Sequence, residues 1–223
     1  MMEFDSKTAK ALQESLNAAG FNCGTPDGIW GKNSQAALEA SYKQYGIAWS
    51  GSRNVNDEFV TKTIKIAKDL QQNDDGGWLM SCMAFETGRT FSPTIQNGAG
   101  AQYFGLVQFG SMAMQDIGVT KDQLLAMTAV QQLDCVYKYF KPYTGKLYDL
   151  TSCYMRILWP VGVTKPNSYV MWDKAIPSQA KAYEQNRGLD VDKNGRITRA
   201  EVGATIWKIY GEGLLIKNRK KIA

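Results

Sequence analysis

One glutamate stands at the end of an otherwise apolar run, WLMSCMAFETGR. Apolar residues at helical spacing predict a helix over 78–86, in which Cys82 and Met83 share a face with Glu86. Apolar neighbours and the negative end of the helix dipole both disfavour a charged carboxylate, so we expect a raised pKa for Glu86. A carboxyl group that keeps its proton near neutral pH can act as a general acid. The alternative is a surface glutamate paired with Arg89.

The chain contains no histidine. Histidine commonly activates serine and cysteine nucleophiles and commonly binds catalytic zinc, so its absence argues against both enzyme classes. Carboxylate chemistry remains, and at neutral pH it points towards cleavage of glycosidic bonds. Most glycosidases use two carboxylates, but no convincing second one is found: Asp116 and Asp122 read equally well as residues near helix ends.

The segment 190–201, DVDKNGRITRAE, matches the whole pattern of an EF-hand calcium loop. Gly195 occupies the sharp turn and Ile197 the position of the apolar anchor. We expect a structural Ca²⁺ here and no cofactor for catalysis. The alternative is an empty loop of the same shape, closed by hydrogen bonds. The expected ligands are the side chains of Asp190, Asp192, Asn194 and Glu201, the carbonyl of Arg196, and Thr198, directly or through water.

A mainly α-helical scaffold must position these side chains. The 223 residues are 44% hydrophobic, which suits one medium-sized domain and a smaller unit. The glycine-rich stretch 98–110, with its Tyr, Phe and Val residues, predicts a small β element. Periodicity and turn residues predict helices up to Gly20, from Asn33 to Gly46, and over 58–72, 78–86, 111–117, 121–140, 147–158, 177–186 and 199–210.

The sequence divides into two units. The stretch GIAWSGSRNVND is rich in Gly, Ser and Asn and has little periodicity, which indicates a linker over 48–57. We therefore expect a small N-terminal domain over 1–47 and a larger α+β domain over 58–223.

The N-terminal string LQESLNAAGFNCGTPDGIWGKNSQAALEASYKQYGI resembles the peptidoglycan-binding domain of the three-helix type over residues 8–47. Its specific part is the turn Asp27-Gly28-Ile29-Trp30-Gly31, where the glycines permit a tight bend. In that family the turn lies near the ligand groove, so the resemblance implies wall binding at Asp27 and Trp30. The alternative is that these two side chains only cap and pack the domain.

Residues 86–93 (ETGRTFSP) and 105–109 (GLVQF) resemble the soluble lytic transglycosylase and goose-type lysozyme group. There a Glu-Ser-Gly block and a Phe-Ser-Pro precede Gly-Leu-Met-Gln or Gly-Leu-Ile-Gln-Phe. This chain departs with Thr87 for Ser and Val107 for Met or Ile. A third block, Ala-Tyr-Asn-Ala-Gly, is poorly kept: Tyr154 is its candidate, and no Asn follows.

This second resemblance covers roughly 75–210 and implies a lysozyme-like domain with a role for each matched residue. Glu86 is the catalytic acid and then the base, Gln108 on the β element lines the glycan groove, and Tyr154 faces the scissile sugar. From the residues alone, Gln108 reads equally as an ordinary strand-end residue and Tyr154 as a core aromatic. Further substrate contacts are expected from Thr87, Gly105 and Phe109.

Together the two resemblances imply a bacteriolytic enzyme of the phage endolysin kind, whose partner is bacterial peptidoglycan. A single acid fits a lytic transglycosylase that cleaves the β-1,4 bond between N-acetylmuramic acid (MurNAc) and N-acetylglucosamine (GlcNAc). The 1,6-anhydro and hydrolytic products stay open. The alternatives are a hydrolytic muramidase, a chitinase-like glycosidase, or a non-catalytic wall-binding virion protein.

Charge and cysteine content suit this expectation. The net charge of +5 favours polyanions such as the wall, and no nucleic-acid motif is seen. No apolar stretch suits a signal peptide or a membrane span, so we expect a monomer made in the host cytoplasm, without stable membrane insertion, that reaches the wall through a phage holin. The four scattered cysteines are expected as buried free thiols.

Overall fold

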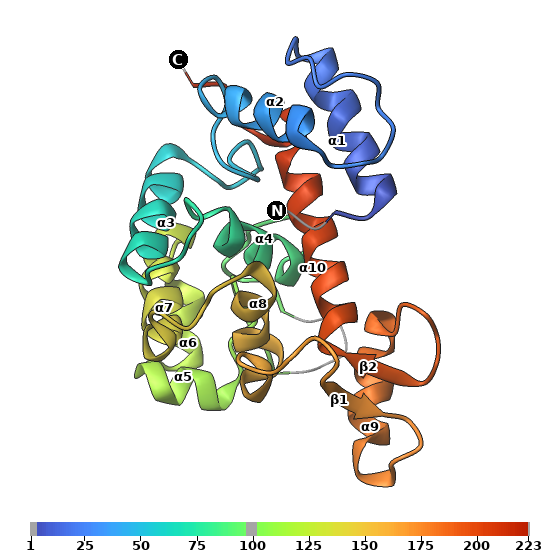
Figure 1. Ribbon diagram of the computed structural model, residues 1–223. Coiled ribbons are helices and arrows are strands. Elements are labelled where there is room, and N and C mark those ends of the chain that lie inside the picture. The colour runs from blue at the N-terminus through green and yellow to red at the C-terminus, as the bar shows by residue number, and fades with distance from the viewer. Residues whose placement is uncertain (1–3, 97–101, 223) are drawn as a thin grey trace.

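The computed structural model describes residues 4–96 and 102–222, and within them the chain is mainly α-helical with one small sheet (Figure 1). This confirms the predicted helical class. The α-helices are α1 (Ser6–Ala18), α2 (Lys32–Tyr42), α3 (Asp57–Asp69), α4 (Gly77–Glu86), α5 (Ser111–Ile117), α6 (Lys121–Ala126), α7 (Ala129–Phe140), α8 (Leu150–Leu158), α9 (Pro177–Asn186) and α10 (Arg199–Leu214). Short 3₁₀ helices are η1 (Lys141–Tyr143), η2 (Pro160–Gly162), η3 (Arg187–Leu189) and η4 (Ile216–Asn218).

Helix α10 runs from the sheet to the two N-terminal helices and packs against α1, α4 and α8 (Figure 1). Glycines on α10 permit close approach of its neighbours. A Cβ at Gly213 would clash with the indole of Trp49, and one at Gly203 would lie 2.9 Å from the hydroxyl of Thr151. The helix therefore joins the N-terminal unit to the helices that form the rest of the core.

The N-terminal unit contains two helices, α1 and α2, in its described residues, rather than the three that the resemblance implied. The side of the unit that a third helix would cover packs instead against α10 and the last residues of the chain. The backbone N–H of Ile222 donates to the carbonyl of Gln44 (2.8 Å), and Lys221 forms a β-bridge with Tyr45. The last residues of the sequence thus pack with the first unit.

The segment 48–57, expected as a linker, is buried at its start. Ala48 and Trp49 are 1% and 3% exposed, and the backbone N–H of Trp49 donates to the carbonyl of Gly213 (3.1 Å). This segment therefore joins the two units by packing between them, and it is not an exposed spacer.

The sheet lies elsewhere than predicted. Strands β1 (Val170–Asp173) and β2 (Arg196–Thr198) pair antiparallel, with Trp172 opposite Ile197. In the predicted stretch 98–110, the described residues form only isolated bridges, from Phe104 to Gln96 and to Phe109, and residues 98–101 lie outside the described part. The glycine-rich composition indicates turns as well as strands, and here the turns prevail.

The helix predicted over 121–140 is two helices, α6 and α7. Met127 is extended (ψ 144°), and the next residue, Thr128, caps α7. Its hydroxyl accepts from the backbone N–H of Gln131, whose side chain accepts from the backbone N–H of Thr128. This capping box was readable as Thr-x-x-Gln in the sequence.

Candidate functional site

Helix α4 presents Glu86 at its C-terminal end. Its residues from Gly77 to Ala84 are buried, because α4 packs against α3, α8 and α10. The carboxylate of Asp74 accepts a hydrogen bond from the backbone N–H of Trp78 (2.7 Å) and fixes the first turn. Within α4, Phe85 and Glu86 are the residues that reach the surface of this packed core.

The helix ends in a Schellman motif directly after Glu86. The N–H of Arg89 donates to the carbonyl of Ala84 (2.7 Å), and the N–H of Gly88 to that of Phe85 (3.3 Å). Gly88 has φ +56°, the left-handed conformation that this turn requires. The prediction that the helix ends at Glu86 is confirmed.

Burial raises the pKa of the Glu86 carboxyl to about 7, while a hydrogen bond from the hydroxyl of Tyr154 partly opposes the shift. Arg89 points elsewhere: its guanidinium forms an ion pair with Glu212, with a shortest N–O distance of 2.7 Å. The alternative of a surface Glu86–Arg89 pair is therefore wrong. At neutral pH, a substantial fraction of Glu86 carries a proton.

Glu86 lines a cavity of about 810 Å³ together with side chains from α8, α9 and β1. Among the described lining residues, Glu86 is the only carboxylate. The two other acids weighed from the sequence lie apart from it. Asp116 lines a neighbouring cavity, and Asp122 is exposed in the first turn of α6.

Gln108 lines the same cavity, but it lies in a turn and not on a strand. Its backbone has φ +52°, which is strained for a residue with a side chain. The side-chain Nε2 donates to the carbonyl of Gly105 (3.0 Å). The Oε1 atom is buried and accepts no hydrogen bond from any described residue. A buried amide oxygen without a donor is unusual in a folded protein.

Gln132 holds this turn in place, and sequence reasoning missed it. Its Oε1 accepts from the backbone N–H of Leu106 (2.7 Å), and its Nε2 donates to the carbonyls of Pro93 (2.9 Å) and Leu124 (3.1 Å). The side chain is fully buried. A glutamine inside a helix gives no sequence signal of such a role, because all three bonds are to residues outside α7.

We expect Gly105→Ala to destabilise the protein by about 2–4 kcal/mol. Gly105 has φ +76°, and a Cβ there would lie 2.8 Å from Cδ of Gln132 and would displace its amide. Urea unfolding measures the loss. Gly188→Ala is the matched control, because its Cβ meets no atom within 4 Å. Equal stability of the two variants would contradict the assigned role of Gln132.

Two tryptophans and two amides form a wall of the cavity that the sequence did not indicate. Trp159 and Trp172 meet edge to face with ring centroids 5.6 Å apart, and Gln185 and Asn186 come from the end of α9. The Nε1 of Trp159 is buried without a partner among the described residues. Aromatic faces with a few polar groups are typical of small-ligand and sugar sites.

The other residues expected at the substrate have different positions. Thr87 is buried, and its hydroxyl donates to the carbonyl of Met83 (2.7 Å) and accepts from the N–H of Phe91 (2.9 Å). Neither Thr87 nor Gly105 lines the cavity. Thr87 forms hydrogen bonds with backbone groups, and Gly105 provides a left-handed backbone conformation in its turn. Phe109 is 1% exposed and packs on Tyr139 beside the neighbouring cavity.

Tyr154 combines its two expected roles. It is a core aromatic, 2% exposed, whose ring packs edge to face on Phe85 with centroids 5.3 Å apart. It also lines the cavity, where its hydroxyl donates to Glu86.

The N-terminal residues expected at the wall serve the structure of their own turn. Asp27 accepts from Nε2 of Gln13 (3.0 Å) and from the N–H of Ile29 (2.8 Å), and these hydrogen bonds lower the pKa of its carboxyl. Trp30 is 8% exposed and donates through its indole N–H to Gln35 (3.0 Å). The capping and packing alternative therefore describes both side chains. Ile29, between them, is 71% exposed.

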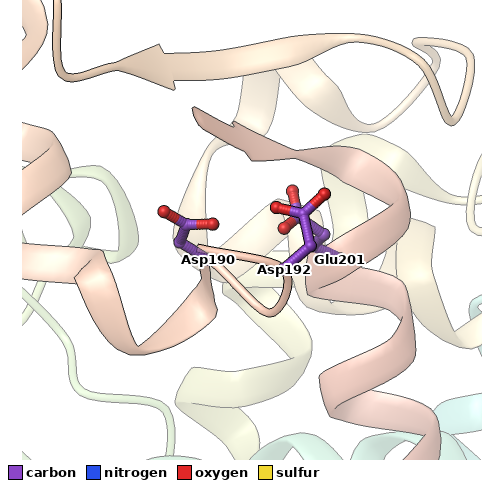
Figure 2. Close-up of side chains that lie close together, drawn as sticks. All are labelled: Asp190, Asp192 and Glu201. Atoms are coloured by element: carbon purple, nitrogen blue, oxygen red, sulfur yellow. The ribbon is translucent and has the colours of Figure 1, made fainter. Parts of the chain in front are cut away.

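The EF-hand-like loop has the shape that its sequence predicts. Ligand atoms of Asp190, Asp192 and Glu201 all lie within 4.8 Å of one another, and Figure 2 shows the three carboxylates grouped at the loop. Gly195 has φ +86°, and Ile197 is fully buried. This donor set of hard oxygens fits Ca²⁺. The remaining expected ligands, Asn194, the Arg196 carbonyl and Thr198, lie on the same loop.

The loop supports the wall of the Glu86 cavity. Its strand β2 pairs with β1, which places Trp172 against Ile197, and the 3₁₀ helix η3 lies between α9 and the loop. The first residue of α10, Arg199, is buried and donates to Ser152 (2.8 Å) and Asn167 (2.6 Å). The loop is therefore in contact with β1 and, through Arg199, with α8, and both elements line the cavity.

All four cysteines are free and buried, as predicted: Cys23, Cys82, Cys135 and Cys153. Cys82 and Cys153 lie beneath the Glu86–Tyr154 pair, with their sulfur atoms 3.8 Å apart.

No model of a known protein family matches the chain, and no curated protein sequence matches it significantly. Within the described residues, none of the helices combines the length and the apolar character needed to cross a bilayer.

Proposed function

We propose that this chain cleaves the β-1,4 bond between MurNAc and GlcNAc in peptidoglycan, with Glu86 as the single acid and base. The observation that supports it most is the state of Glu86: a carboxyl with a pKa of about 7 that lines a cavity of about 810 Å³. A cavity of this size suits a few sugar rings, and amides and aromatic rings line it.

Protonated Glu86 gives its proton to the glycosidic oxygen, and the bond from that oxygen to the MurNAc C1 breaks. The Glu86 carboxylate then takes the proton of the C6 hydroxyl of the same sugar, whose oxygen bonds to C1 and gives a 1,6-anhydro product. If water takes the place of that hydroxyl, the same residue yields a hydrolysed sugar. The absence of a second carboxylate among the described lining residues favours the internal attack, because Glu86 acts in both steps.

The other lining side chains assist by orienting the glycan. The free Oε1 of Gln108 can accept from a sugar hydroxyl or acetamide N–H, and the hydroxyl of Tyr154 stabilises the Glu86 carboxylate between the two steps. Trp159 and Trp172 offer apolar ring faces to the sugars.

In this proposal residues 1–47 hold the enzyme on the wall, and the chain is a monomeric phage endolysin that is made in the host cytoplasm and released through a holin. Tethering raises the effective concentration of substrate at the cavity. Since Asp27 and Trp30 are used within their turn, the exposed Ile29 is the better candidate for wall contact.

Purified protein added to purified bacterial walls tests the proposal. We expect the turbidity of the suspension to fall as soluble fragments are released. A chitinase-like enzyme would instead act on GlcNAc oligomers and leave the walls intact. A non-catalytic virion protein would sediment with the walls without clearing them, and that result would overturn the proposal.

We also propose that Ca²⁺ binds the 190–201 loop and stabilises the fold. At a hundredfold excess over its Kd, a ligand adds about 2.7 kcal/mol to the free energy of unfolding. We expect calcium to raise the melting temperature of the wild type and of Asp122→Asn, and to have no effect on Glu201→Gln, which loses the bidentate ligand. An equal shift with magnesium, or no shift with calcium, would contradict the site.

A further inference from the structure

A second cavity, of about 480 Å³, adjoins the one that contains Glu86. Both are lined by Tyr103, Gln108 and Ile157, so these three side chains form the boundary between them. Of the three, Tyr103 is 48% exposed. The proposed cleavage uses only the first cavity, and the second has no role in it.

The side chain of Arg156 lines the second cavity and is held in place by its neighbours. The guanidinium of Arg156 lies on the ring of Tyr139, with Cζ 3.8 Å from the ring centroid, and near that of Tyr143 at 4.7 Å. Its Nε and Nη2 donate to the carbonyl of Tyr139 at 3.1 and 2.9 Å. Among the described residues, Nη1 has no hydrogen-bond acceptor and no carboxylate pairs with the group. Arg156 therefore offers a fixed, unpaired positive charge to a ligand.

The same cavity also has a carboxylate and an apolar rim. Asp116 on α5 is exposed and lines the cavity, and it forms no ion pair with any described cation. Met112, one turn earlier, is 78% exposed. A ligand that fits these groups carries a carboxylate, an ammonium or amide N–H, and short apolar side chains. A short peptide has this chemistry, and an unsubstituted amino-sugar chain lacks the carboxylate.

We propose that the second cavity binds the peptide stem attached to the MurNAc residue at the cleavage site. This inference rests on the proposed glycan cleavage. With the sugar beside Glu86, its lactyl substituent would cross the Tyr103–Gln108 boundary and place stem carboxylates at Arg156 and the stem ammonium at Asp116. The enzyme then distinguishes peptide-bearing glycan from bare glycan by charge as well as by shape.

Binding of soluble glycan fragments to the inactive Glu86→Gln protein tests this proposal. Two ligands are used: a MurNAc–GlcNAc tetrasaccharide with intact stems, and the same tetrasaccharide after the stems are removed by an amidase. We expect about tenfold tighter binding of the stem-bearing form, which corresponds to one charge-assisted hydrogen bond. The second substitution Arg156→Gln, or Asp116→Asn, should remove most of this preference, and Asp122→Asn, a nearby exposed acid outside the cavity, should keep it.

The outcomes separate this inference from the proposed reaction. Equal binding of the two ligands, or a preference that both cavity variants retain, would overturn it. Arg156 packs on Tyr139, so its substitution can disturb the fold. Asp116 is exposed, so loss of the preference in Asp116→Asn cannot be explained in that way. Weakening of both ligands to the same degree would indicate a structural role and would also overturn it. A clear preference for stems, with no glycan cleavage by the wild type, would support the peptide site and refute the proposed reaction.

Discussion

Glu86→Gln will lower the rate of wall clearing by a factor of about 10²–10⁴, the range expected for the loss of a general acid. Glutamine has nearly the shape of the protonated carboxyl, so the cavity and the bond from Tyr154 can persist while proton transfer is lost. The initial slope of turbidity against enzyme concentration measures the effect. Glu58→Gln, which changes an exposed glutamate in the first turn of α3, is the matched control.

Two other results are informative. If Glu86→Gln and the wild type clear walls at the same rate, Glu86 is not the acid and the proposed reaction is wrong. If the control also loses activity, folded content measured by circular dichroism shows whether the loss arises from unfolding.

The same substitution will stabilise the protein at high pH and not at low pH. The folded pKa of Glu86 is about 7 against an ordinary value of 4.5, so the folded state holds a proton between these values that the unfolded chain has released. Wild-type stability therefore falls as pH rises from about 4.5 to about 7 and stays lowered above that. Glutamine has no such dependence, and at about pH 8 we expect a gain on the order of 2–3 kcal/mol.

Urea unfolding at about pH 8 and about pH 4 measures this difference, and at the lower pH the two proteins should be nearly equal. Because Asp74 is also buried with a pKa raised to about 6, it contributes to the pH dependence of both proteins and cancels in the comparison. A wild type that is more stable than Glu86→Gln at about pH 8 would mean that the carboxylate is well solvated or paired, and that the burial argument fails.

Local patterns predicted the parts of the site that depend on neighbours in sequence. The apolar run and Gly88 fixed the end of α4 and the burial around Glu86, and the loop 190–201 has its expected turn at Gly195. The break between α6 and α7 also depends on neighbours in sequence, since the capping box at Thr128 marks the start of α7. That feature was missed because the hydrophobic pattern continues across the break.

The parts that the sequence could not predict depend on tertiary packing. The tryptophan and amide wall comes from the residue after α8, from β1 and from the end of α9, which meet only after the chain has folded back on α4. Gln132 bonds to three separated segments, and nothing near it in sequence indicates them. The ion pair of Arg89 with Glu212 likewise spans the chain, so the charge state of Glu86 is determined by burial, with an opposing hydrogen bond from Tyr154, and not by Arg89.

The most direct test of the central claim is mass spectrometry of the fragments that the wild-type protein releases from purified peptidoglycan. We expect muropeptides with 1,6-anhydro-MurNAc ends, absent from a digest with Glu86→Gln. MurNAc reducing ends would keep Glu86 as the acid with water as the attacking group. Fragments cut only in the peptide, with every glycan strand intact, would contradict the proposal that a protonated Glu86 cleaves the sugar bond.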